Sequence, residues 1–203
     1  MKKPTLLLAT NNAGKLKEMQ AILQSLDITL LHPADLGLTL EVEEDGQTYA
    51  ENAARKARAF ARASGLVALA DDTGLEVDAL GGQPGLHSRR FGHAPFNDAS
   101  RRAYLLEQLV GKPRPWRAKF RATVAIANPE GSVRFAEGTC AGEITPQERG
   151  TGGFGYDSIF FLPEVNATMA ELDAETKNRL SHRGQAVRNA IPILLEILEQ
   201  ESR

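Results

Sequence analysis

The chain alternates between short apolar runs, which are typical of buried strands, and longer amphipathic runs, which are typical of helices. The first apolar run covers residues 4–9, and the segment after Gly14 places Leu16, Met19 and Leu23 at helical spacing. The alternation continues along the chain and is typical of a sheet covered by helices. It therefore excludes the all-helical and all-strand classes and predicts an α/β fold.

The length and composition describe a chain that builds its own hydrophobic core. With 203 residues, 42% hydrophobic and 25% charged, we expect one domain over residues 1–203, with two lobes. The formal charge of −2 excludes a globally basic nucleic-acid binder. The single Cys140 excludes a disulfide framework and a zinc site built from cysteines.

The N-terminal residues resemble the start of a signal peptide, because Lys2 and Lys3 precede an apolar run that ends at Ala9. That run is shorter than the roughly seven to fifteen residues that a signal peptide needs. No segment approaches the roughly 18 consecutive apolar residues of a membrane-spanning helix. We therefore expect a soluble, reduced, cytoplasmic protein with no membrane partner.

A capping pattern marks one helix clearly. Thr48 and Glu51 form a T-x-x-E capping box, and Gly65 is typical of the position just past a helix end, so we predict a helix to about Ser64. A tight turn over residues 128–131 predicts a hairpin. The remaining elements that we expect are strands over 28–31, 66–70, 76–80, 120–127, 133–136 and 159–162, and helices over 97–110 and from Ser181, where Pro192 kinks or restarts the helix.

The helix from Thr48 carries one lysine on an unexpected face. A wheel of 100° per residue places three arginines, Arg55 among them, on one polar face, which is typical of a solvated surface. Lys56 falls instead on the inward stripe with Asn52 and Phe60. A lysine there either extends its ammonium group along apolar surface to water or faces a ligand.

The polar turn after the first strand is a candidate phosphate site. Backbone N–H groups at a helix start favour an anion, and Lys15 adds a positive charge. The turn lacks the glycine and the Ser or Thr of a P-loop, because Ala9 and Leu16 occupy those positions. The alternative is an ordinary turn between strand and helix with a solvated lysine.

Two adjacent carboxylates, Asp71 and Asp72, follow an apolar strand. Ligands of α/β proteins gather outside the carboxyl ends of strands, and paired carboxylates there suit a hard cation such as Mg²⁺. Such a pair also raises the pKa of one member, as a general base requires. The acidic loop over 41–46, with Glu43 and Glu44, is a source of a further carboxylate. The alternative is an Asp-Asp-Thr-Gly turn.

Residues 150–155 satisfy the G-x-G-x-x-G pattern literally, but a dinucleotide-binding loop follows a strand and opens a helix. The flanking sequence has neither, so we exclude that function. A tight loop that brings backbone close to a ligand remains, with Phe154 and Tyr156 for stacking and Asp157 for a polar contact. A purely structural turn is the alternative.

A conflict with the helix dipole marks the start of the last helix. Ser181 is a good N-cap, but His182 and Arg183 then place cations in the first turn, where they are unfavourable. We interpret this conflict as an indication of function.

Other chemistries lack support in the sequence. The four histidines have no metal-binding spacing, and no G-x-S-x-G or Cys/His pattern indicates acyl transfer. Residues 101–121 are rich in Lys and Arg, with Trp116 and Phe120 between them. They form either a solvated face and loop or a nucleic-acid-binding patch.

Five blocks, in order and over nearly the whole chain, together resemble the inosine/xanthosine triphosphate pyrophosphatase family. Three departures, Thr73 for a more usual serine, Arg89 for alanine and Ser158 for proline, remove no group that the chemistry uses. The matching blocks are residues 8–15, 44–53, 70–80, 153–157 and 181–183.

The resemblance implies an elongated, strongly curved mixed β-sheet with flanking helices, in two lobes around a central nucleotide cleft, and usually a homodimer. It implies Mg²⁺-dependent hydrolysis of ITP, dITP and XTP to the monophosphate and pyrophosphate. A triphosphate carries about four negative charges, which lysines and Mg²⁺ would neutralise. No nucleic-acid partner is expected.

The resemblance also assigns residues by position. Glu44 and Asp72 hold the metal, Asp72 activates the water, and Asp71 is either a further metal carboxylate or a supporting one. Phosphate contacts are assigned to Thr10, Asn11, Asn12, Ala13, Gly14, Lys15 and Lys56. The nucleoside site is assigned to Thr73, Phe154, Gly155, Tyr156, Asp157, Lys177, His182 and Arg183.

Three alternatives remain open from the sequence. The first is a related pyrophosphatase for pyrimidine or modified nucleotides, against which residues 181–183 argue. The second is a nucleic-acid-binding module that uses residues 101–121 and shows salt-dependent affinity without turnover. The third is a sensor that binds the nucleotide and Mg²⁺ without hydrolysis.

Overall fold

The structure, a computed structural model, describes residues 3–94 and 97–201. The chain divides into two compact units, which are described separately. Unit 1 comprises Met1–Asp72, Ala122–Gly138 and Arg183–Arg203, and unit 2 comprises Thr73–Arg121 and Thr139–His182. Across the two described ranges, every helix falls short of the length and apolar content needed to cross a membrane.

The strands form a mixed sheet in the order β2-β1-β3-β5-β6-β7-β8, with β4 paired to β3. β1 is parallel to β2 and β3, whereas β3–β4, β6–β7 and β7–β8 are antiparallel pairs. The predicted mixed α/β fold with flanking helices is confirmed. The strands are β1 (Thr5–Leu8), β2 (Thr29–Leu31), β3 (Val67–Val77), β4 (Pro84–Gly85), β5 (Trp116–Ala127), β6 (Val133–Ile144), β7 (Phe160–Leu162) and β8 (Ala167–Thr168).

Four of the five helices given below lie close to the predicted positions, and α4 was not predicted. The last of them runs through Pro192 as one element, so the proline does not restart it. The helices are α1 (Ala13–Leu23), α2 (Tyr49–Ser64), α3 (Asp98–Leu109), α4 (Ala174–Leu180) and α5 (His182–Glu201).

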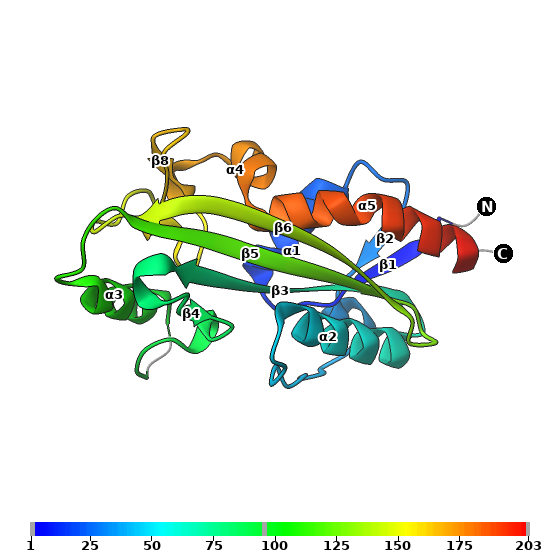
Figure 1. Cartoon of the computed structure of the whole chain (residues 1–203). Helices are drawn as coiled ribbons and strands as arrows, with labels where there is room; N and C mark the ends of the chain where they lie inside the picture. Colours follow the sequence, from blue (N-terminus) through cyan, green and yellow to red (C-terminus); the bar gives the residue numbers. More distant parts are fainter. Residues whose placement is uncertain (1–2, 95–96, 202–203) are drawn as a thin grey trace. The chain divides into compact units, whose positions relative to one another are not determined.

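The pleat of the strands sorts the core of unit 1 into two layers. Successive side chains of a strand point to opposite faces, so Leu6 and Leu8 pack with α1 and α5. Leu7 and Ala68 lie in a second cluster with alanines and Phe60 of α2. Figure 1 shows α5 and α2 on opposite sides of these strands. The small alanine side chains bring α2 close to the sheet.

Unit 2 has a core of its own, built around aromatic and branched residues of β5, β7 and the segment before β7. Phe120 and Phe160 pack with ring centroids 4.6 Å apart, and Leu105 and Leu109 anchor α3 to this cluster. Tyr156 belongs to the same core and is 4% exposed. The glycine-rich loop that precedes it is therefore attached to a packed scaffold at its C-terminal end.

The capping of α2 is confirmed in part. The Thr48 side chain accepts from the Glu51 N–H at 3.1 Å, and Gly65 has the left-handed φ of 67° expected just past the helix. The Glu51 carboxylate does not complete the box, because its Oε2 accepts from the N–H of Gln47 at 2.8 Å. Glu51 thus orders the backbone at Gln47, the residue before the N-cap.

The predicted strand over 66–70 does not end at Asp71 and Asp72, so the alternative of an Asp-Asp-Thr-Gly turn is wrong. The prediction of a separate strand over 76–80 is wrong too. β3 runs without interruption from Val67 to Val77, and a short 3₁₀ turn follows over Asp78–Leu80. Asp71 and Asp72 are 2% and 7% exposed within this strand. Two buried acids persist in a strand only with charged or hydrogen-bonding partners, and the other elements of unit 1 supply them.

Candidate functional site

The turn between β1 and α1 is ordered by its own side chains. Asn12 is the N-cap of α1, and its Oδ1 accepts from the N–H of Lys15 at 3.0 Å. The N–H of Asn12 in turn donates to Oγ1 of Thr10 at 3.2 Å. These two bonds fix the start of α1 and therefore the direction in which the Lys15 side chain leaves it.

The ammonium group of Lys15 lies within unit 1 against an acid of β3. Its Nζ is 3.0 Å from Oδ1 of Asp71, and only 17% of the lysine side chain is exposed. Burial lowers the pKa of Lys15, while the Asp71 carboxylate acts in the opposite direction. An anion that binds Lys15 would either displace Asp71 from the ammonium group or share the ammonium group with it.

Asp71 is enclosed by two cations. Its second oxygen, Oδ2, accepts from Nε of Arg183 at 3.0 Å, and its side chain is 1% exposed. Burial alone would raise the pKa of Asp71, but Lys15, Arg183 and Lys56 hold it well below its usual range. The carboxylate is therefore ionised and serves its neighbours as a fixed counter-charge.

The partners of Arg183 explain why this cation lies in the first turn of α5, where the helix dipole is unfavourable to it. Nη1 of Arg183 lies 2.5 Å from Oε2 of Glu18 in α1, in addition to the contact with Asp71. Two carboxylates outweigh an unfavourable first-turn position, whose cost is typically below about 1 kcal/mol. Glu18 is a residue that the sequence reasoning missed. Its position three residues after Lys15, on one face of α1, is the signal that was available.

Lys56 lies where the helical wheel predicts it. Its side chain is 12% exposed, against 47% for the neighbouring Arg55, which pairs with Asp45 at the surface. The Nζ of Lys56 donates to Oε1 of Glu44 at 2.8 Å and to the backbone oxygen of Asp71 at 2.6 Å. Lys56 therefore connects the acidic loop to β3.

Asp72 occupies the opposite face of β3 from Asp71. Its Oδ2 accepts from Nδ2 of Asn52 at 3.0 Å, and its Oδ1 lies 3.9 Å from Nζ of Lys56. Burial raises the pKa of Asp72, with the two lysines Lys56 and Lys15 and the Asn52 bond opposing that rise. Adjacent acids thus acquire pKa shifts of opposite sign, because the pleat gives them different neighbours.

Asn52 is the second residue that the sequence reasoning left without a role. Its amide nitrogen binds Asp72, and its Oδ1 accepts from the N–H of Gly46 at 2.8 Å. A Cβ added at Gly46 would lie 2.6 Å from that oxygen, so this close approach requires glycine. Asn52 shares the inward stripe with Lys56, which lies one turn later, and that spacing was the signal for it.

Two carboxylates, Glu44 and Asp72, converge on Lys56. Within residues 3–94 and 97–201, no group of three His, Cys, Asp or Glu side chains is arranged to hold a metal ion. A cage made of protein ligands alone is therefore not built here. One or two carboxylates that share the ion with substrate phosphates and water are the arrangement that Mg²⁺ usually takes, and Glu44 and Asp72 fit it.

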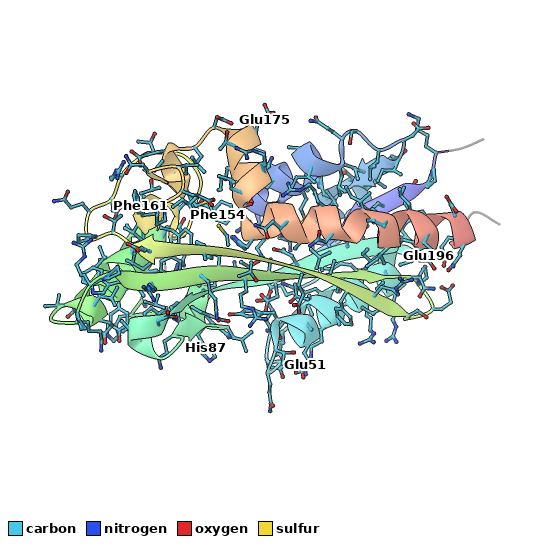
Figure 2. All side chains as sticks on the ribbon, turned by 45° about the horizontal axis from the view of Figure 1, so that its top comes forward. Glu51, His87, Phe154, Phe161, Glu175 and Glu196 are labelled. Atoms are coloured by element: carbon cyan, nitrogen blue, oxygen red, sulfur yellow. The ribbon has the colours of Figure 1, made fainter. Side chains whose placement is uncertain are left out.

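Unit 2 carries a separate cluster of three predicted residues. Oδ2 of Asp157 accepts from Nζ of Lys177 at 2.7 Å and from the N–H of Phe154 at 2.8 Å. The Lys177 ammonium also lies 5.0 Å from the centroid of the Phe154 ring. Figure 2 shows Phe154 beside α4, the helix that carries Lys177. An aromatic face and a cation are thus held together by one carboxylate.

The glycine-rich loop is a tight turn, as predicted, and β6 ends at Ile144, well before it. Gly150 and Gly153 have φ of 79° and 73°. A Cβ at Gly150 would meet the Ala170 backbone at 2.5 Å, and one at Gly153 would meet Oδ2 of Asp157 at 2.1 Å. A 3₁₀ turn over Asp157–Ile159, not a helix, comes after the loop, which supports the exclusion of a dinucleotide site.

Three other predicted residues of unit 2 are placed differently. Tyr156 is not available for stacking, because its ring is in the core and its hydroxyl donates to the Ser88 carbonyl at 2.8 Å. His182 is 5% exposed and stacks on Phe120, with centroids 4.5 Å apart and 12° between the planes. Thr73 is partly buried in β3.

Comparison with known proteins connects the chain to a family. The model of the Ham1 family matches residues 6–193. A relative from Desulforamulus reducens named dITP/XTP pyrophosphatase is 49% identical over 190 residues, which cover 93% of this chain and 94% of the relative. One from Nostoc with the same name is 46% identical over 199 residues, covering 97% of each chain.

Solved structures agree. A HAM1 protein from Coxiella burnetii superposes with a TM-score of 0.85 at 39% identity, over 95% of this chain and 99% of that one. The Staphylococcus aureus Ham1 protein gives a TM-score of 0.80 at 37% identity, over 97% and 99%. The family resemblance that the sequence shows is thereby confirmed: the chain belongs to the Ham1 family.

Proposed function

We propose that this chain is a hydrolase that converts non-standard purine nucleoside triphosphates, ITP, dITP and XTP, to the monophosphate and pyrophosphate. The relatives named dITP/XTP pyrophosphatase support the substrate class. The observation that carries the proposal is the cluster in unit 1, where Lys15 and Lys56 lie beside the carboxylates of Asp71, Asp72 and Glu44. Phosphoryl chemistry requires such cations for the phosphates and carboxylates for a metal and a water.

The phosphates bind, in this proposal, to the start of α1 and to Lys56. Lys15 and Lys56 supply full charges, and the ordered turn supplies backbone N–H groups at a helix N-terminus. Asp71 favours the charged form of Lys15 against the effect of burial. It is not itself a metal ligand in this proposal, because Lys15 and Arg183 contact its two oxygens. The phosphate-binding residues are Thr10, Asn11, Asn12, Ala13, Gly14, Lys15 and Lys56.

Mg²⁺ would be held by Glu44 and Asp72, and when bound it lowers the pKa of a coordinated water and stabilises charge on the phosphates. Asp72 also accepts the proton of the attacking water. Burial moves the pKa of Asp72 upward from its ordinary value of 3.8, toward that of a base that works near neutral pH. Asn52 orients Asp72 by donating to its Oδ2.

The nucleoside contacts residues of the glycine-rich loop and of α4. A purine ring stacks on Phe154, and Lys177 offers a donor to the 6-oxo group that hypoxanthine and xanthine share. Adenine presents a 6-amino donor at that position, so ATP sets one donor against another, the Lys177 ammonium. The nucleoside-binding residues in this proposal are Thr73, Phe154, Gly155, Asp157 and Lys177. Tyr156, His182 and Arg183, which the resemblance also assigns to the nucleoside, are engaged by other protein groups: Tyr156 by the core and Ser88, His182 by Phe120, and Arg183 by Asp71 and Glu18.

The test is a substrate panel with ITP, dITP, XTP, ATP, GTP and dCTP, each with and without Mg²⁺, in which pyrophosphate and monophosphate are quantified. The proposal requires Mg²⁺-dependent release of pyrophosphate from the 6-oxo purine triphosphates ITP, dITP and XTP. Turnover of dCTP instead would favour the pyrimidine alternative. Binding of ITP without any product would make the protein a sensor, and salt-dependent affinity for DNA or RNA without turnover would make it a nucleic-acid-binding module.

We also propose that the protein works in the cytoplasm as a homodimer. Both proposals rest on the resemblance to the family, and the single buried Cys140 is compatible with a reducing compartment. Light scattering of the purified protein would give the mass of the assembly. A mass of one chain, 22.0 kDa, would contradict the dimer.

Lys56→Ala should impair catalysis far more than Arg55→Ala, although the two residues are adjacent. Lys56 is buried against Glu44 and β3, whereas Arg55 pairs with Asp45 at the surface, where an ion pair contributes little. Loss of a charge-assisted contact corresponds to a fall in kcat/KM of about 10- to 100-fold for Lys56→Ala. For Arg55→Ala we expect less than about a threefold change. Equal losses in steady-state kinetics of the two variants would contradict this assignment of Lys56.

A further inference from the structure

Helix α3 holds one residue of the glycine-rich loop by both of its backbone polar groups. The N–H of Gly155 donates to Oδ2 of Asp98 at 2.7 Å, and the carbonyl of Gly155 accepts from Nη1 of Arg102 at 2.9 Å. Asp98 and Arg102 are four residues apart, so their side chains leave the same face of α3. We call these three residues the α3 clamp.

The clamp acts on the residue that has the most conformational freedom. Gly155 has a φ of 64°, and a Cβ added there would meet no atom within 4 Å, so it is the left-handed backbone and not crowding that favours glycine. The N–H of Gly155 belongs to the peptide plane shared with Phe154, and its carbonyl to the plane shared with Tyr156. Because both planes are held, both backbone dihedrals of Gly155 are fixed.

One side of the loop borders a cavity. A cavity of about 170 Å³ is lined by residues 150–155 of the loop together with Asp98, Arg102 and Glu148. A loop that faces a cavity depends on directed polar contacts for its conformation. Glu148 supports the clamp, because its Oε2 lies 2.9 Å from Nη2 of Arg102 and accepts from Oγ of Ser158 at 3.0 Å.

The clamp adjoins the cluster of Phe154, Asp157 and Lys177 directly. The peptide plane that Asp98 holds is the one that follows Phe154, and the Phe154 N–H donates to Asp157 on the other side. Rotation of either plane at Gly155 would therefore turn the Phe154 ring away from Lys177 or break the contact with Asp157. The sequence does not reveal this connection, because 53 residues separate Arg102 from Gly155.

We infer that Asp98 and Arg102 are positioning residues for nucleoside binding, which act by fixing Gly155 and, through it, the Phe154 ring. This inference rests on the proposed function, in which Phe154 stacks on the purine. Neither residue contacts the reacting phosphates in that proposal. Their loss should therefore weaken nucleotide binding and leave the chemical step nearly intact.

The test is steady-state hydrolysis of ITP at saturating Mg²⁺. Asp98→Ala and Arg102→Met should each raise KM about tenfold and change kcat less than about twofold, as expected when binding common to ground and transition states is lost. Asp98→Asn should restore KM to within about threefold of the unmodified protein, because its amide oxygen still accepts from Gly155. Glu107→Ala, at an exposed position of α3, and Arg117→Met, at an exposed position of β5, are the matched controls and should leave KM unchanged.

Arg102→Lys tests the same contact if Arg102→Met fails to fold. It keeps the charge and the aliphatic stem, but one ammonium group cannot reproduce the fork that contacts both Gly155 and Glu148, so KM should rise severalfold. The double variant Asp98→Ala/Arg102→Met should raise KM by less than the product of the two single effects, since both residues fix the same glycine.

Phe154→Ala separates the inference from the proposed function. If Phe154→Ala raises KM while the clamp variants bind ITP normally, the role of Asp98 and Arg102 is wrong and the proposed function stands. If Phe154→Ala leaves KM unchanged, the proposed nucleoside site itself is wrong. A fall in kcat at unchanged KM in the clamp variants would also overturn the inference, because it would place the two residues in the chemical step or in folding.

Discussion

Asp72→Asn is expected to lower kcat for ITP by at least about 100-fold, with the fold and nucleotide binding retained. The amide still accepts from Asn52 and has the same shape, but it cannot take a proton and is a weak ligand for Mg²⁺. Burial raises the pKa of Asp72, which suits a residue that accepts a proton.

Two comparisons make this result specific to Asp72. Glu44→Gln removes the other proposed metal ligand without removing the base, so it should chiefly raise the Mg²⁺ concentration needed for half-maximal activity. Asn52→Ala removes the group that orients Asp72 and should give an intermediate kcat. Near-normal turnover by Asp72→Asn at saturating Mg²⁺ would remove Asp72 from the mechanism.

Asp71→Ala is expected to lower the free energy of unfolding by about 3–5 kcal/mol, the cost of leaving buried charges without their partner. Lys15 and Arg183 lose the acid that contacts both of them, although Arg183 retains the carboxylate of Glu18. Urea unfolding measures the change. Asp45→Ala is the control, because that exposed acid pairs with Arg55 at the surface and should cost about 1 kcal/mol or less.

The cost of Asp71→Ala should also depend on pH in a defined direction. The pKa of Asp71 is lower in the folded state than in the unfolded state, so the unfolded chain binds more protons in acid. The stabilisation by Asp71 is fully present above the unfolded pKa of about 4 and is lost progressively as the pH falls from there toward the much lower folded pKa. The two unfolding curves should therefore converge in acid. A constant difference between pH 7 and pH 3 would contradict the buried ion pairs.

The sequence predicts most elements of the fold because local patterns determine them. Thr48, Gly65 and the turn at 128–131 mark ends of elements by their own conformational preferences, and the structure confirms all three. The error at residues 71–74 has a tertiary cause. Asp and Gly favour turns in isolation, but here buried cations from α1, α2 and α5 stabilise the two acids inside a strand.

The candidate site could be predicted where one side chain contradicts its local pattern. Lys56 is conspicuous as a lysine on the inward stripe of α2, and its burial in the structure confirms that its side chain faces inward. Glu18 and Asn52 do not contradict anything locally, since a polar residue in a helix is ordinary. Their roles depend on Arg183 and Asp72, which are distant in sequence, so only the folded chain reveals them.

The pleat of β3 gives Asp71 and Asp72 their separate surroundings, and this has a consequence for how the gene can change. An insertion or deletion of one residue between Val67 and Asp71 would turn each acid toward the other's neighbours. Both aspartates would still be present in the strand. Asp71 would then face Asn52, however, and Asp72 would take the place of the fixed counter-charge between Lys15 and Arg183. We therefore expect natural selection to remove insertions and deletions of one codon from β3, while the turn at 128–131 can accept them. Whether an aspartate occupies an odd or an even position of the strand decides which face it lies on, and therefore which of the two roles it has.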